Sequence, residues 1–171
     1  MRRAIHAHGL ELAPKQVIES GTWQGHSAWL LARACPDAEI HSFDIEHDNL
    51  LHRDPKVTFH LGDWTATDLG APDPARSLVF FDDHVSHAQR IREAHARGYR
   101  ILLLDDNVPA KALYATGVPP VPTVDMLFDS RLTPGETIDW HYRGRDLRFQ
   151  CRAADWEVRS LVRQDVRVPS L

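Results

Sequence analysis

Five short apolar runs, separated by helix-like or loop-like sequence, constrain the fold of this chain most strongly. The runs lie at residues 16–19, 39–44, 57–61, 77–81 and 101–104. Two helix-like stretches lie between them, at residues 28–34 before Pro36 and at residues 87–97 before Gly98. Short apolar strands with interleaved helices are typical of parallel sheets covered on both faces. The sequence therefore predicts an α/β fold with a doubly wound, mostly parallel sheet.

The last third of the chain differs in composition. Five of the eleven prolines lie between Asn107 and Pro134, so residues 107–135 are predicted to form a long loop or lid, a kind of segment that is often functional. Residues 137–142 and 147–151 flank a turn around Gly144 and predict a C-terminal antiparallel hairpin. Residues 156–168 are expected to add one more strand. The chain is therefore predicted to form a single domain over residues 1–171. This domain would consist of a core at residues 13–106, the loop at residues 107–135 and C-terminal strands at residues 136–171.

Composition and charge exclude several classes of protein. The net charge of −4 over 171 residues provides no basic field for nucleic acid. The two cysteines, Cys35 and Cys151, form no CxxC pair, which argues against a disulfide framework or a zinc knuckle. No apolar run approaches the length of a membrane span, and the first residues are too polar for a secretion signal. We therefore expect a cytoplasmic protein that binds neither nucleic acid nor a membrane.

The first apolar run ends in a glycine turn, Glu-Ser-Gly-Thr-Trp-Gln-Gly, at residues 19–25. Gly21 permits a tight exit from the strand, and Gly25 lets the backbone approach a ligand where a helix begins. The spacing differs from Gly-x-Gly-x-x-Gly, which argues against a nicotinamide cofactor. Asp44 closes the second run, where a carboxylate can accept both hydroxyls of a ribose, and Asp63 and Trp64 follow the third. These strand ends favour a nucleoside site over carboxylates that merely terminate strands.

A second group of oxygen ligands follows the fourth and fifth runs: Asp82, Asp105, Asp106 and Asn107. Magnesium prefers one or two carboxylates completed by substrate and water oxygens, whereas zinc would favour the histidines. His84 stands two residues beyond Asp82, either as a general base or as an exposed residue at a helix start. The sequence thus predicts a hard divalent cation beside the nucleoside site.

Residues 19–27, Glu-Ser-Gly-Thr-Trp-Gln-Gly-His-Ser, resemble the first motif of class I S-adenosylmethionine-dependent methyltransferases. The resemblance is closest to the macrocin-type sugar O-methyltransferases, which also place an aromatic residue between the glycines. Residues 79–82 and 103–108 are similar to the two metal-binding strand ends of those enzymes and of catechol O-methyltransferase. The resemblance runs in order from about Val17 to Val108. It implies a Rossmann-like methyltransferase fold with the cofactor-binding core at residues 13–106.

The resemblance also implies roles for individual residues. S-adenosylmethionine is the implied cofactor, and the residues expected to flank its methionine part are Glu19, Gly21 and Gly25. Thr22 is also expected to bind the cofactor. Asp44 would bind the ribose, and Asp63 and Trp64 the adenine. The residues expected to hold Mg²⁺ or another divalent cation are Asp82, Asp106 and either Asp105 or Asn107. His84 and Asp82 are the expected catalytic residues.

We therefore predict a metal-assisted S-adenosylmethionine-dependent O-methyltransferase for a hydroxylated small molecule, with a sugar or glycosylated natural product favoured over a catechol. Val85 replaces a lysine of catechol-type enzymes, and residues 1–12 leave room for one short helix. The acceptor pocket would then be completed by a partner subunit in a homo-oligomer or by the Pro-rich loop, unless activity has been lost. Two alternatives stay open: a non-catalytic S-adenosylmethionine- or nucleotide-binding domain, and a metal-dependent hydrolase using Asp82, Asp105, Asp106 and His84.

Overall fold

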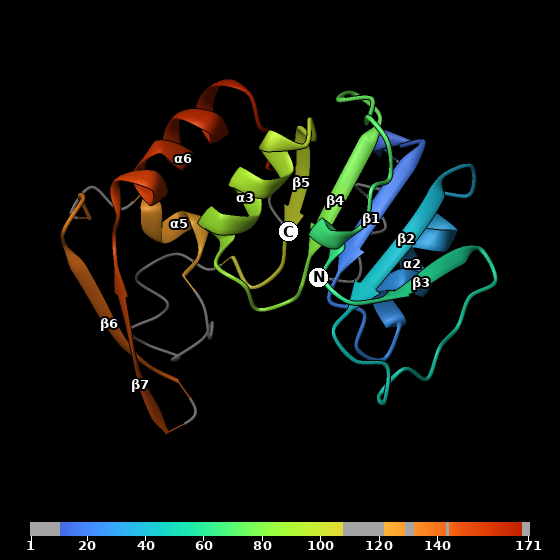
Figure 1. Ribbon diagram of the computed structural model, residues 1–171, viewed down its shortest axis with the longest axis horizontal. Helices are drawn as coiled ribbons and strands as arrows, with labels where there is room; N and C mark the ends of the chain where they lie inside the picture. Colours follow the sequence, from blue (N-terminus) through green and yellow to red (C-terminus); the bar gives the residue numbers. More distant parts are fainter. Residues whose placement is uncertain (1–10, 108–121, 129–131, 143, 169–171) are drawn as a thin grey trace.

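A five-stranded parallel sheet forms the centre of the molecule. The computed structural model describes residues 11–107, 122–128, 132–142 and 144–168. The strands are β1 (Gln16–Ser20), β2 (Glu39–Asp44), β3 (Val57–Leu61), β4 (Ser77–Phe81) and β5 (Ile101–Leu104). They lie in the order β3-β2-β1-β4-β5, and every neighbouring pair is parallel (Figure 1). The predicted doubly wound sheet is confirmed, and the strand order reverses between β1 and β4.

Two hydrophobic clusters cover opposite faces of this sheet, because neighbouring residues of a strand point to opposite sides. On one face α2 (His26–Ala34) buries Leu31 in a cluster that also contains Val17. On the other face α3 (His87–Ala96) buries Ile91 in a cluster that contains Ile18. Burial on both faces explains why the central strands are continuous apolar runs rather than alternating ones. Both helices lie where the sequence predicts them.

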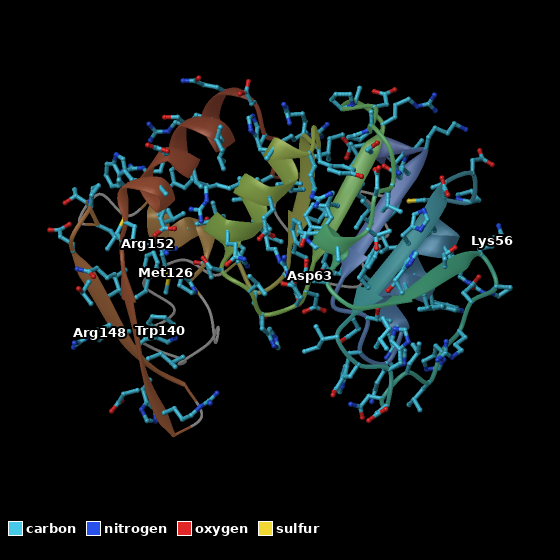
Figure 2. The ribbon with its side chains drawn as sticks, in the orientation of Figure 1. Lys56, Asp63, Met126, Trp140, Arg148 and Arg152 are labelled. Carbon is cyan, nitrogen blue, oxygen red and sulfur yellow. The ribbon has the colours of Figure 1, made fainter. Side chains whose placement is uncertain are left out.

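The predicted C-terminal hairpin is confirmed as a separate antiparallel pair, β6 (Thr137–Tyr142) and β7 (Arg145–Gln150). Tyr142 pairs with Arg145, so β7 begins two residues earlier than predicted and the turn is shorter. Trp140 is buried on the side that faces the rest of the molecule, whereas Arg148 points outward (Figure 2). Most of the predicted loop at residues 107–135 lies outside the described residues, but residues 124–127 form the short helix α5 (Val124–Leu127).

The strand predicted for residues 156–168 is wrong, because this segment lies largely in the helix α6 (Ala153–Gln164). Its apolar residues recur with the three- and four-residue spacing of one helix face: Val158, Leu161 and Val162. Val158 is completely buried, and α6 packs against α3. Beyond the helix, Arg167 forms a single parallel bridge with Ile101 at the edge of β5. Among the described residues, no helix is both long and apolar enough to cross a membrane.

Candidate functional site

A pocket of about 560 Å³ opens at the carboxyl edge of the sheet and is lined by residues that end or follow all five strands. Parallel sheets bind ligands at this edge, next to the point where the strand order reverses. Figure 2 shows the labelled Asp63 at the edge toward which the strand arrows point. The sequence-predicted site residues that line the pocket are Gly21, Asp44, Asp63, Asp82, His84, Asp105 and Asp106.

The two glycines of the turn are required by the chain's own backbone. Gly21 has a φ of +105°, and a Cβ atom there would lie 2.3 Å from the carbonyl oxygen of Asp82. Gly25 begins α2 with a φ of +82°, and a Cβ atom there would lie 2.3 Å from the carbonyl oxygen of His52. Gly21 lines the pocket, whereas Gly25 does not. The need for glycine at residue 25 is therefore explained by the neighbouring loop rather than by a ligand.

Glu19 and Thr22, both predicted to contact the cofactor, are buried behind the pocket wall. The Ser42 hydroxyl donates to a carboxylate oxygen of Glu19 and lies 2.6 Å from the Thr22 hydroxyl, which can therefore donate to Ser42. Complete burial raises the pKa of Glu19 to about 7, although the hydrogen bond from Ser42 opposes this rise. These side chains connect the ends of β1 and β2 beneath the turn, and their predicted cofactor contacts stay predictions.

Asp44 lies at the pocket, where its carboxylate is held by backbone N–H groups. Oδ2 accepts the N–H of Trp23 at 2.7 Å, and Oδ1 accepts the N–H of Glu46 at 3.3 Å. Each carboxylate oxygen has more than one lone pair, so both can still accept a hydrogen bond from a ligand hydroxyl. Ile45, the next residue, is 80% exposed and also lines the pocket.

Asp63 and Trp64, both predicted to lie beside adenine, occupy different environments. Asp63 lines the pocket and begins the short 3₁₀ helix η1 (Trp64–Ala66), where it accepts the N–H of Thr65 at 2.8 Å. Trp64 is 1% exposed and lies edge-on to Phe81 and Tyr99 in the core, so its side chain does not line the pocket. Trp64 is buried in the core because full burial of a large aromatic side chain stabilises the fold more than partial burial in a pocket wall does.

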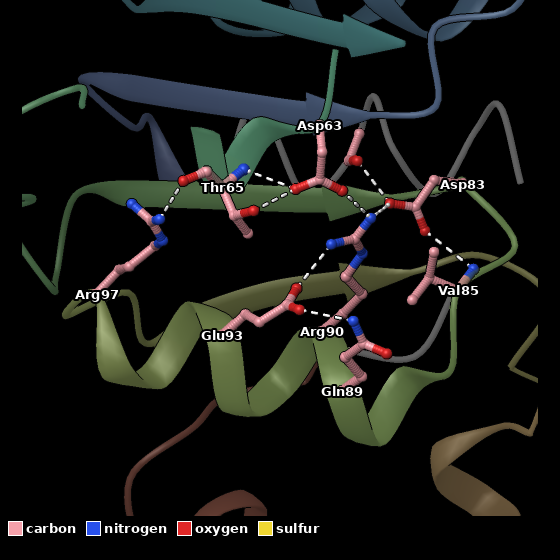
Figure 3. Close-up of polar contacts among 9 residues, drawn as sticks. Asp63, Thr65, Asp83, Val85, Gln89, Arg90, Glu93 and Arg97 are labelled. Atoms are coloured by element: carbon pink, nitrogen blue, oxygen red, sulfur yellow. Dashed lines mark hydrogen bonds and ion pairs between the residues drawn. The ribbon is translucent and has the colours of Figure 1, made fainter. Parts of the chain in front are cut away.

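A buried arginine that the sequence did not reveal joins the strand ends at the back of the pocket. Arg90 of α3 is 4% exposed at its side chain and reaches Asp63, Asp83 and Glu93 (Figure 3). Ser20, the last residue of β1, donates its hydroxyl to Asp83 at 2.5 Å. Residues that follow β3 and β4 thus meet Glu93 of the same helix at one guanidinium. Sequence patterns could not identify the role of Arg90, because Asp63 and Asp83 become its neighbours only when α3 packs on the sheet.

Three carboxylates from β4 and β5 crowd together on the other side of the pocket. Burial, followed by the charge and hydrogen bond of Asp105, raises the pKa of Asp82 to about 8. Burial and the charge of Asp105 also raise the pKa of Asp106. Among the described residues, no group of three histidine, cysteine or acidic side chains already has the arrangement of a metal site. The donor set nevertheless suits a hard divalent cation, which would relieve the repulsion and take its other ligands from water and substrate.

Asn107 and His84 complete the set of predicted site residues. The Asn107 side chain points to α5, where it accepts the N–H of Asp125 at 3.2 Å and donates to its carboxylate at 3.3 Å, so it does not line the pocket. The His84 side chain is 60% exposed at the rim, with Nε2 at 3.8 Å from Oδ2 of Asp106. His84 and Asp106 both have positive φ, at 56° and 54°. Such strain in non-glycine residues clusters at functional sites.

No protein-family model and no curated protein matches this sequence. Among solved structures, CmcI with SAH has a TM-score of 0.54 at 16% identity and matches 63% of this chain and 60% of its own. CmcI with Mg-SAM has a TM-score of 0.51 at 17% identity, over 67% of this chain and 55% of its own. TomG, an O-methyltransferase from Streptomyces achromogenes in complex with SAM, has a TM-score of 0.50 at 19% identity, over 86% and 76%. The match thus spans little more than half of CmcI, and at such identities it establishes the fold: this chain has the class I S-adenosylmethionine-dependent methyltransferase fold.

Proposed function

We propose that this chain is an S-adenosylmethionine-dependent O-methyltransferase whose hydroxylated acceptor is held with a divalent cation. The observation that carries the proposal is one pocket that joins the Gly21 turn and Asp44 to the carboxylates of β4 and β5. The solved structures of the same fold support it, since TomG is an O-methyltransferase involved in tomaymycin synthesis and CmcI has a structure with Mg-SAM.

The ends of β1, β2 and β3 form the cofactor side of the pocket. Asp44 would accept the two ribose hydroxyls, because both of its oxygens are held in place by backbone N–H groups and keep a free lone pair. The bare backbone of Gly21 would let the methionine part lie close to the end of β1. The cofactor supplies an electrophilic methyl group, so the main task of these residues is to orient it for in-line attack.

The ends of β4 and β5 form the acceptor side. Asp82 and Asp105 would hold the cation together with Asp106. Because its pKa is raised, the Asp82 carboxyl keeps a proton at neutral pH, and binding of the cation would release that proton. A bound cation would act as a Lewis acid and lower the pKa of an acceptor hydroxyl. His84 lies at the rim of this side, where it would take the acceptor's proton while Asp106 stabilises the imidazolium.

The acceptor class that we favour is polyhydroxylated, a sugar or a glycosylated natural product. Acidic side chains dominate the acceptor side of the pocket, and neighbouring hydroxyls can donate to carboxylates as well as bind a cation. Completion of this side by a partner subunit or by the Pro-rich loop stays a prediction, because residues 108–121 lie outside the described residues.

Calorimetric titration with S-adenosylhomocysteine, with and without Mg²⁺, tests the proposal. We expect micromolar binding, and Asp44→Ala should weaken it roughly 10- to 100-fold, as loss of a hydrogen bond to a charged group implies. Asp37→Ala, which removes an exposed carboxylate just before β2, is the matched control and should bind as the wild type does. Absence of binding in both conditions would overturn the proposal and favour the hydrolase alternative.

A further inference from the structure

Arg90 occupies a position that the proposed reaction leaves unexplained. One nitrogen, Nη2, lies 2.8 Å from Oδ2 of Asp63 and 2.7 Å from Oδ2 of Asp83, while Nη1 lies 2.6 Å from Glu93. A buried arginine is costly unless its charge is compensated, and here three carboxylates surround it. Its planar fork holds the two aspartates with one nitrogen and Glu93 with the other, which the single nitrogen of a lysine ammonium could not do.

Asp63 is held from two directions by this arrangement. Arg90 fixes Oδ2, and the N–H and hydroxyl of Thr65 both donate to Oδ1 (Figure 3). The Asp63 side chain is still 39% exposed, and it lines the pocket. Burial alone would raise the pKa of Asp63, but the hydrogen bonds from Arg90 and Thr65 hold it below its usual value. The carboxylate therefore faces the pocket as a pure acceptor.

We propose that Arg90 is a positioning residue that fixes Asp63 as an acceptor, so that the pocket selects a nucleobase carrying an exocyclic amine over one without it. The inference rests on the proposed function and deepens it, because it names the residue that sets base specificity. A site with a fixed acceptor rejects a ligand that lacks the donor, since the acceptor then loses its partner.

The experiment compares the affinities of S-adenosylhomocysteine and its 6-desamino purine analogue by calorimetry. The wild type should prefer the amino ligand about 10- to 100-fold, the range expected for a hydrogen bond to a carboxylate. In Arg90→Lys the preference should fall below about threefold, because lysine has a single nitrogen and cannot hold Glu93 on one side and the two aspartates on the other. Arg92→Lys is the matched control: Arg92 lies on the same helix and pairs with buried Asp155, and it does not line the pocket. Its preference should equal that of the wild type.

A purely structural Arg90 would give a different result. Arg90→Lys would then weaken both ligands by the same factor and keep the preference, which would overturn the inference. Because Arg90→Lys could fail to fold, Glu93→Gln provides a second test. It weakens the ion pair that holds Arg90 on the side away from the pocket. An undiminished preference for the amino ligand in Glu93→Gln also overturns the inference. Equal wild-type affinities for the two ligands would refute base selection but leave the proposed cofactor site intact. Failure of the wild type to bind either ligand would refute both.

Discussion

Glu19→Gln should change how the stability of this protein depends on pH. The Glu19 carboxyl is completely buried, and this burial raises its pKa from 4.5 to about 7. The native state therefore holds the proton more tightly than the unfolded chain, so the stability that the protonated group provides is lost as pH rises from 4.5 through 7. At about 1.4 kcal/mol per pH unit, this pKa difference corresponds to a total loss of about 3.5 kcal/mol by pH 8. Glutamine has almost the same shape and cannot ionise, so the variant should not show this loss.

Urea unfolding at pH 5 and at pH 8, followed by tryptophan fluorescence, measures the effect. The variant should gain about 2.5 kcal/mol relative to the wild type between the two pH values, as the linkage relation requires for a range that begins just above the unfolded pKa. Glu157→Gln, which removes an exposed carboxylate of α6, is the control and should follow the wild type. If the free-energy difference between Glu19→Gln and the wild type is the same at both pH values, Glu19 ionises without penalty and the reasoning fails.

Three further predictions concern the pocket and α3. Gly21→Ala should lower the unfolding free energy by at least about 1–2 kcal/mol and abolish S-adenosylhomocysteine binding, since Cβ would meet the carbonyl of Asp82; urea unfolding and calorimetry measure both. Burial lowers the pKa of His87 to about 4, so stability should fall as pH drops from 6.5 toward 4, and acid unfolding followed by circular dichroism should begin at a lower pH in His87→Gln. Asp106→Ala should abolish Mg²⁺-dependent turnover while leaving S-adenosylhomocysteine affinity within about twofold, because only the acceptor side changes; a methyl-transfer assay and calorimetry separate these effects.

The sheet and the place of the pocket could be predicted from local sequence. Phe80 and Leu103 belong to runs without polar interruption, which a parallel sheet covered on both faces requires. Once five such strands are parallel, their carboxyl ends share one edge, so Asp44 and Asp82 must lie near each other although 38 residues separate them in the chain. Topology alone therefore brings the predicted residues to one pocket.

Other features depend on packing that local sequence does not encode. Trp64 follows a glycine and an aspartate, a context that favours a loop at the surface. Its side chain is nevertheless buried in the core beside Phe81. The segment after Ala153 mixes charged and apolar residues, and its helical spacing becomes decisive only when Val158 of α6 packs into the core against α3. The role of Arg90 gives no signal before α3 is docked, because Asp63 and Asp83 come from separate loops and only Glu93 lies on its own helix.

Local costs to stability accumulate at one edge of this sheet. Burial places Glu19 and Asp82 where ionisation is unfavourable, and His84 and Asp106 adopt backbone angles that non-glycine residues rarely take. Among the described residues, positive φ outside glycine occurs at Trp23, His84 and Asp106 near this edge and at Ala13 near the opposite one. Buried ionisable groups and strained backbone angles persist at a site where a bound ligand compensates for them. Selection for function tolerates the lost stability at such a site and removes it elsewhere. Since most of the crowded groups are carboxylates, the ligand that would relieve them is cationic, which fits both a divalent cation and the sulfonium of the proposed cofactor.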